Sequence, residues 1–202
     1  MSEFTLPLQP LKGRGAATRN AHRFAQEARA AFDDGWQTWA QLSEAQAAVA
    51  PTEVRWEDAR SAITTNDSPD IGFDRSVNPY RGCEHGCSYC YARPTHSYLG
   101  LSPGLDFERV IIAKRGLAEQ LRRELMRPVY RPGMIVIGSA TDAYQPVERE
   151  LKITRSLIEV LQAARHPFSL VTKSAGVERD LDLIAPMAGA GLAAVYVTLS
   201  TL

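Results

Sequence analysis

Apolar residues follow two regular patterns along the second half of the chain. Short continuous apolar runs have the length of buried strands. Between these runs, apolar residues recur every three or four positions, as they do on one face of a helix. The predicted strands are 110–113, 134–138, 168–172 and 192–199, with a shorter extended piece at 73–78. The predicted helices are 117–126, 148–164 and 177–187.

Strands and helices alternate from residue 134 onward, and this order predicts the fold class. Helices of about ten residues or more between strands are typical of right-handed βαβ units on a parallel sheet. We therefore expect an α/β fold. The chain stops at Leu202, directly after the last predicted strand and without a helix to cover it. Because parallel sheets are normally covered on both faces, we expect this chain to be a fragment of a longer protein.

Residues 1–54 differ in character from the rest and predict an N-terminal arm. The stretch 12–16 is basic and interrupted by glycines, which is typical of a flexible tail, although its backbone N–H groups could also contact an anion. Residues 20–49 are rich in Ala, Gln, Glu and Arg. We expect the arm to be poorly ordered or to form short helices, and we assign residues 55–202 to the folded part.

The overall composition is ordinary for a globular protein and excludes some classes of function. The chain has 202 residues, with 23 Lys and Arg against 23 Asp and Glu, so its net charge is zero. Bulk charge therefore does not favour a protein that coats nucleic acid. No apolar run approaches the roughly 18–20 residues of a membrane span, and Met1–Pro10 has no apolar core of signal-peptide length. We expect a cytoplasmic protein with no membrane partner.

All three cysteines of the chain lie in one short loop with the spacing C-x3-C-x2-C: Cys83, Cys87 and Cys90. An odd, tightly clustered set is a poor disulfide framework but a good set of ligands for a soft metal centre. Gly82 and Gly86 allow such a loop to curl. A [4Fe–4S] cluster on three cysteines leaves one iron without a protein ligand, and catalytic metal sites keep an open position of this kind.

A structural zinc site is the main alternative for this loop. Three cysteines and one histidine are a common structural zinc set, and His85 or His96 could complete it. Such a chain would be a non-catalytic zinc or iron–sulfur module that binds a partner or nucleic acid through its Arg-rich arm. A ferredoxin-like electron carrier needs four cysteines for each cluster, and the sequence has only three.

The cysteine loop, with Tyr89 before the last cysteine, resembles the signature of the radical S-adenosylmethionine (radical SAM) superfamily. The resemblance covers residues 66–202. It implies a [4Fe–4S] cluster that reductively cleaves SAM to a 5′-deoxyadenosyl radical, which takes a hydrogen atom from a substrate. It also implies a partial (β/α) TIM-like barrel with the cluster loop after its first strand. About four strands are expected here, where six are usual, so the barrel would be truncated.

Within that superfamily, the chain most resembles the spore photoproduct lyase-like branch and its uncharacterised bacterial relatives. The similar segments are 78–83, 140–148 and 168–174. Lyases of this branch carry a hydrogen-donating cysteine three residues before the aspartate that Asp142 matches, but this chain has Ser139 there. A serine O–H bond is much stronger than a thiol S–H bond, so photoproduct repair is not expected. A lyase-like enzyme with another substrate, such as a nucleic-acid-related one, remains the expectation.

Polar residues stand where the predicted strands end, which is where parallel barrels bind substrates. By the resemblance, Thr141 and Asp142 would reach the amino-acid end of SAM and Lys173 its carboxylate. Thr198 would approach the ribose, and Tyr91 would lie beside the adenosyl group. No catalytic residue is assigned. The same positions also suit β-forming threonines, a turn or helix cap at 141–142, and a solvated lysine. An external electron donor of flavodoxin or ferredoxin type would be the partner.

Overall fold

The computed structural model describes residues 15–16, 22, 24 and 51–199. The chain divides into two compact units. One comprises Met1–Val54 and Gly82–Ile111, and the other comprises Arg55–Arg81 and Ile112–Leu202. The short helices predicted for residues 20–49 lie outside the described residues, apart from His22 and Phe24.

The second unit contains a largely parallel sheet of five strands in the order β2-β3-β6-β7-β8. Only β2 runs antiparallel, to β3, and the other neighbouring pairs are parallel. The prediction of a parallel α/β sheet is therefore confirmed for four strands. The strands are β2 Thr64–Thr65, β3 Arg75–Val77, β6 Ile135–Ile137, β7 Phe168–Thr172 and β8 Ala193–Val197.

The apolar runs 134–138 and 168–172 form β6 and β7, which have a strand neighbour on each side. Ile135 and Ile137 of β6 are fully buried, as are Phe168 and Leu170 of β7. By contrast, β8 has one strand neighbour among the described residues and is only partly buried. The two apolar runs at the centre of the sheet are therefore the buried ones, as expected of parallel strands.

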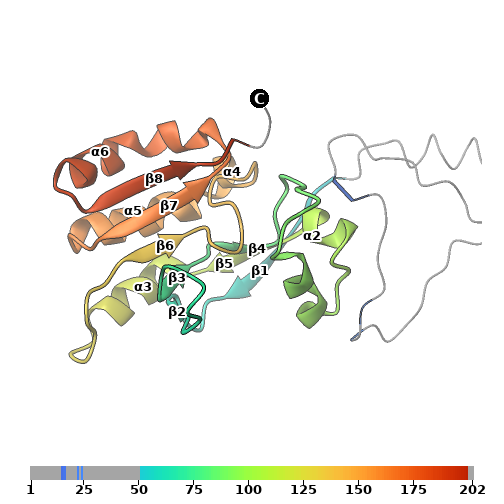
Figure 1. Ribbon diagram of the computed structural model, residues 1–202, viewed down its shortest axis with the longest axis horizontal. Coiled ribbons are helices and arrows are strands. Elements are labelled where there is room, and N and C mark those ends of the chain that lie inside the picture. Colours follow the sequence, from blue (N-terminus) through green and yellow to red (C-terminus); the bar gives the residue numbers. More distant parts are fainter. Residues whose placement is uncertain (1–14, 17–21, 23, 25–50, 200–202) are drawn as a thin grey trace, which may run out of the picture. The chain divides into compact units, whose positions relative to one another are not determined.

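Helix α6 packs against β8, α5 packs between α3 and α6, and Figure 1 shows α5 and α6 next to β7 and β8. On α5, Leu157, Ile158 and Leu161 are fully buried, which is the apolar stripe that predicted the helix. The helices of this unit are α3 Leu117–Leu125, α4 Glu148–Leu151, α5 Ile153–Ala163 and α6 Leu181–Gly189, with a 3-10 turn η2 at Ala175–Asp180.

The prediction of one continuous helix over 148–164 is wrong. The helix is interrupted at Lys152, which adopts the left-handed conformation with φ 53°. This conformation costs a non-glycine residue about 1 kcal/mol. The break allows the Glu148 carboxylate at the start of α4 to accept the backbone N–H groups of Thr154 and Arg155 in the first turn of α5. A buried carboxylate therefore caps the positive end of α5.

A second, three-stranded sheet has the order β1-β5-β4. Its strands are β1 Glu53–Asp58, β4 Tyr80–Arg81 and β5 Val110–Arg115. The run 110–113 was predicted as a strand, and it is one, but it pairs antiparallel with β4 and not with the parallel strands. The protein is therefore a mixed α/β fold with two sheets. Among the described residues, none of the helices has the length and apolar character needed to cross a bilayer.

A histidine lies at the amino ends of the parallel strands. His166, just before β7, receives a hydrogen bond from the Tyr130 hydroxyl at its Nε2 (2.8 Å), while its Nδ1 lies 3.0 Å from the Pro167 carbonyl. Burial lowers the pKa of His166, and the charge of Arg75 lowers it further, while the hydrogen bond to Pro167 acts in the opposite direction. The folded protein therefore favours the neutral imidazole.

We expect the pH dependence of stability to reflect this histidine. Its folded pKa lies below the unfolded value of about 6.5, so the unfolded chain binds more protons as the pH falls. The contribution is fully present above about pH 6.5 and is lost as the pH falls toward the folded pKa. Urea unfolding of the wild type should give a larger free energy at pH 7.5 than at pH 5.5. His166→Gln should reduce this difference, and an unchanged difference would contradict the assignment.

Candidate functional site

Polar side chains tie together the loops at the carboxyl edge of the parallel sheet. Asn78 follows β3, and its amide Nδ2 donates to the Ser139 hydroxyl (3.1 Å) in the loop after β6. The Asn78 Oδ1 accepts the backbone N–H of Ala140 at 2.8 Å. One asparagine therefore links the loops that follow two neighbouring strands. Sequence reasoning did not select Asn78, although it lies within the 78–83 segment that carries the resemblance.

Asp142 makes the corresponding link between the next two strands. Its carboxylate accepts the Thr172 hydroxyl and the backbone N–H of Lys173, both at 2.7 Å. The same carboxylate accepts the backbone N–H of Tyr144 at 2.8 Å, which makes an Asx turn. The turn role that the sequence left open for Asp142 is thus present. A contact between Asp142 and SAM would have to be additional to these hydrogen bonds.

Four of the five predicted SAM contacts come from this edge of the second unit: Thr141, Asp142, Lys173 and Thr198. The Thr141 hydroxyl is buried and accepts a hydrogen bond from Gln145 Nε2 at 3.1 Å. Lys173 is half-buried and directly follows β7. Thr198 is exposed, and its backbone N–H donates to Thr172 O at 2.8 Å. These four residues therefore lie in the loops at the carboxyl edge of the parallel sheet, while the fifth, Tyr91, belongs to the other unit and is 75% exposed.

The cysteine loop lies in the first unit. Cys83 is buried, and its backbone N–H donates to Phe107 O at 2.9 Å. Cys87 and Cys90 are half-buried and are joined by a turn in which Cys90 N donates to Cys87 O (3.2 Å). Gly82 has φ 84°, and a Cβ there would lie 2.8 Å from Phe107 O. Only glycine fits this conformation and this close approach.

Arg93 binds the cysteine loop through hydrogen bonds from its guanidinium, and this role was not predicted. Its Nε donates to Cys87 O at 2.9 Å, and its Nη1 donates to Gly104 O at 3.1 Å. Its Nη2 is paired with Glu108, whose side chain is fully buried in α2, Leu105–Arg109. With its side chain only 11% exposed, Arg93 therefore faces the interior of this unit. The sequence signal that could have suggested this pair is Glu108, a glutamate at a helix position that is buried. A buried glutamate requires a partner such as an arginine.

His96, one of the two histidines that could complete a zinc site, is also an internal residue. It lies in the 3-10 helix η1, Arg93–Leu99, and is fully buried. Its Nε2 is 2.9 Å from Val110 O, and its ring packs against Phe107 with the ring centroids 5.1 Å apart. The Nε2 atom is therefore engaged by a backbone carbonyl and is not available to a zinc ion in this conformation.

The three cysteines are free thiols. Within the part of the chain that the structure describes, no three His, Cys, Asp or Glu side chains come together as a group that could hold a metal ion. The donor set itself suits a soft metal, because three thiols lie within one curled loop. The side chains of this loop would have to turn toward one another to bind a cluster or an ion.

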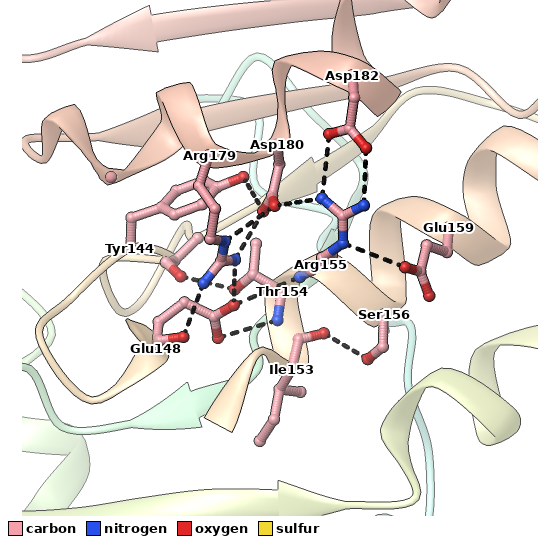
Figure 2. A network of polar contacts seen from close by, with 12 residues as sticks. Tyr144, Glu148, Ile153, Thr154, Arg155, Ser156, Glu159, Arg179, Asp180 and Asp182 are labelled. Atoms are coloured by element: carbon pink, nitrogen blue, oxygen red, sulfur yellow. Dashed lines mark hydrogen bonds and ion pairs between the residues drawn. The ribbon is translucent and has the colours of Figure 1, made fainter. Parts of the chain in front are cut away.

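A buried charge network supports the loop that carries Thr141 and Asp142 (Figure 2). Glu148, at the end of this loop, is 1% exposed and accepts hydrogen bonds from Arg179 Nη2 (2.8 Å) and from the Tyr80 hydroxyl. Asp180 is fully buried and accepts the Tyr144 hydroxyl at 2.9 Å. Arg179 bridges the two carboxylates. The network thus joins β4, the loop after β6 and the start of α6.

The pKa values in this network follow from burial and ion pairing. Burial by itself would raise the pKa of Asp180, but hydrogen bonds from Arg179, Arg155 and Tyr144 outweigh it and hold that pKa below its ordinary value. Burial raises the pKa of the Tyr144 phenol, and the Asp180 charge raises it further. Both groups therefore keep one protonation state near neutral pH, as expected of a structural network that does not transfer protons.

Comparison with known proteins finds several uncharacterised relatives. The chain is 43% identical over 118 residues to the uncharacterized protein Rv2578c of Mycobacterium tuberculosis, covering 58% of this chain and 35% of that protein. The uncharacterized protein Mb2609c of Mycobacterium bovis matches equally. The uncharacterized protein MJ0683 of Methanocaldococcus jannaschii is 31% identical over 107 residues, covering 53% of this chain and 38% of that protein.

The chain spans little more than a third of the length of these curated relatives. None of the known family profiles matches the chain, and none of the solved structures matches it either. The relatives therefore show that similar sequences occur in both bacteria and an archaeon, and they do not provide a function.

Proposed function

We propose that this chain is the cofactor-binding part of a radical SAM enzyme. The observation that carries the proposal is the run Cys83-x3-Cys87-x2-Cys90, which begins six residues after the parallel strand β3, with the two-residue strand β4 between them. In a parallel α/β fold, binding groups are found after the carboxyl ends of strands. Three further parallel strands follow, with helices between them, as the first part of a partial barrel would require.

In this proposal the three thiolates of the cysteine loop hold a [4Fe–4S] cluster. Gly82 and Gly86, both at positive φ, give the loop its curl. The Arg93 guanidinium donates a hydrogen bond to Cys87 O. This bond would hold the backbone at Cys87 in place while the cysteine side chains turn toward the cluster. When bound, the cluster would supply the electron that cleaves SAM to a 5′-deoxyadenosyl radical, which takes a hydrogen atom from the substrate.

The strand-edge residues are proposed to bind SAM. Hydroxyl, carboxylate and ammonium groups are the hydrogen-bond partners that an amino acid with a ribose requires. Asp142 accepts hydrogen bonds from the Thr172 hydroxyl and the Lys173 backbone N–H. These bonds fix the backbone from which the Lys173 side chain extends. Ser139 is held by Asn78, and its strong O–H bond excludes it as the hydrogen donor that the lyases require. The substrate is therefore proposed to differ from a DNA photoproduct.

Metal analysis tests the proposal most directly. Protein purified without oxygen and reconstituted with iron and sulfide should be brown and contain about four irons per chain. Addition of dithionite and SAM should then yield both methionine and 5′-deoxyadenosine. A colourless protein with one zinc, unchanged by reconstitution, would contradict the proposal and favour a structural zinc module.

Lys173→Ala tests the SAM contact separately from the cluster. The variant should keep its iron and colour, because Lys173 lies outside the cysteine loop, while losing a charged hydrogen bond of about 1.5 kcal/mol, or roughly tenfold in affinity for SAM. Equilibrium dialysis of the reconstituted protein measures this affinity. Lys152→Ala removes an exposed lysine for which no SAM contact is proposed, and it serves as the control. Unchanged SAM affinity in Lys173→Ala would show that this assignment is wrong.

A further inference from the structure

The N-terminal segment that contains Gly15 and Ala16 contacts the cysteine loop, although the two are about seventy residues apart in sequence. The Gly15 backbone N–H donates to Glu108 Oε2 at 3.0 Å. A Cβ placed on Gly15 would lie 1.6 Å from Gly86 O and 2.8 Å from Gly86 C. A side chain of any size at position 15 is therefore incompatible with this contact.

A side chain on the loop residue Gly86 would also collide with the N-terminal segment. Gly86 stands between Cys83 and Cys87 and has φ +64°. A Cβ on Gly86 would lie 2.9 Å from Gly15 N and 3.0 Å from Glu108 Oε2. Two glycines thus meet backbone to backbone, and each needs the other to lack a side chain. This close approach therefore depends on glycine at both positions.

A chain of hydrogen bonds connects this contact to the cysteines. Glu108, which accepts Gly15 N–H, is paired with Arg93, and Arg93 Nε donates to Cys87 O. The Glu108 side chain is fully buried, and the Arg93 side chain is only 11% exposed. Because a buried carboxylate needs its hydrogen-bond partners, removing the Gly15 N–H weakens the group that holds the loop.

We propose that the Gly15–Ala16 segment is a built-in cover for the cysteine loop and controls access to its thiols. When this segment is docked, it occupies the space beside Gly86 and supports the Glu108–Arg93 pair beneath Cys87. When it is released, Cys87 and Cys90, which are half-buried, become more exposed. This cover requires no metal, and only its consequence for cofactor loading rests on the proposed function.

The test compares two single-methyl substitutions in the full chain. Gly15→Ala places a Cβ against Gly86, whereas Gly72→Ala adds the same methyl where no atom lies within 4 Å. In the reduced, metal-free protein, alkylation of Cys87 and Cys90 by iodoacetamide, followed by mass spectrometry, should be on the order of fivefold faster in Gly15→Ala because thiol reactivity follows exposure. Gly72→Ala should react like the wild type.

Hydrogen exchange provides a second readout of the same release. Backbone amides of residues 83–93 should exchange faster in Gly15→Ala, while those of the parallel sheet should remain unchanged. Equal alkylation in all three proteins, or an equal increase in both variants, would overturn the cover. These measurements use protein without iron or SAM. A failure of the protein to bind iron would therefore reject the proposed function, but it would not affect the alkylation and exchange results that test the cover.

Discussion

Cys87→Ala should remove nearly all iron from the reconstituted protein. The wild type should hold about four irons per chain, and we expect the variant to hold less than about 0.5. Cys87 is the central residue of the three, and it is joined by a turn to Cys90 and by its carbonyl to Arg93. Two remaining thiolates would leave two irons of the cluster without protein ligands.

The adjacent Ser88→Ala variant is a matched control, since it changes one side-chain atom in the same loop and removes no thiol. It should retain iron and colour at the wild-type level. Iron and acid-labile sulfide would be measured after anaerobic reconstitution, together with the visible absorption. Full iron retention in Cys87→Ala would show that this thiol is not a ligand and would contradict the proposed cluster.

Glu148→Ala should cause the largest loss of stability of the substitutions considered. The carboxylate is 1% exposed and accepts hydrogen bonds from Arg179 and from Thr154 N. It also accepts the hydroxyl of Tyr80, a residue that is 1% exposed. Without it, these buried donors lose their acceptor, and α5 loses its cap. Removing one partner of a buried pair costs about 3 kcal/mol or more.

Glu150→Ala provides a control in the same short helix, because Glu150 is exposed and has the same side chain. Its effect on the free energy of unfolding should be within about 0.5 kcal/mol. Urea unfolding at pH 7 would measure both variants. A loss below about 1 kcal/mol in Glu148→Ala would mean that the network in Figure 2 contributes little to stability.

Local pattern was sufficient for most elements of the parallel sheet. The predicted strands at 134–138 and 168–172 match β6 and β7 within a residue or two at each end. The helix predicted at 117–126 is α3. Apolar patterning reports burial, and the short length of these two runs favours a strand over a helix. The break at Lys152 was missed because it depends on a buried carboxylate that caps the next helix.

The strand-edge residues were predictable as a group, since carboxyl ends of parallel strands meet at one edge. What each residue does there was not predictable. Asp142 is bound by the backbone of a neighbouring strand's loop, thirty-one residues further along the chain at Lys173. Asn78 was missed for the same reason, because its partner Ala140 is sixty-two residues away. Hydrogen bonds of this range leave no periodic pattern.

The amino-acid sequence by itself determined the three-cysteine loop, its position before a series of strands and helices, and the residues at the strand ends. These features depend on residue type and local spacing. The tertiary structure alone decided that 110–115 pairs outside the parallel sheet, that His96 and Arg93 are internal, and that Gly15 meets Gly86. These outcomes depend on which distant surfaces fit each other, and close packing selects among partners that local pattern cannot distinguish.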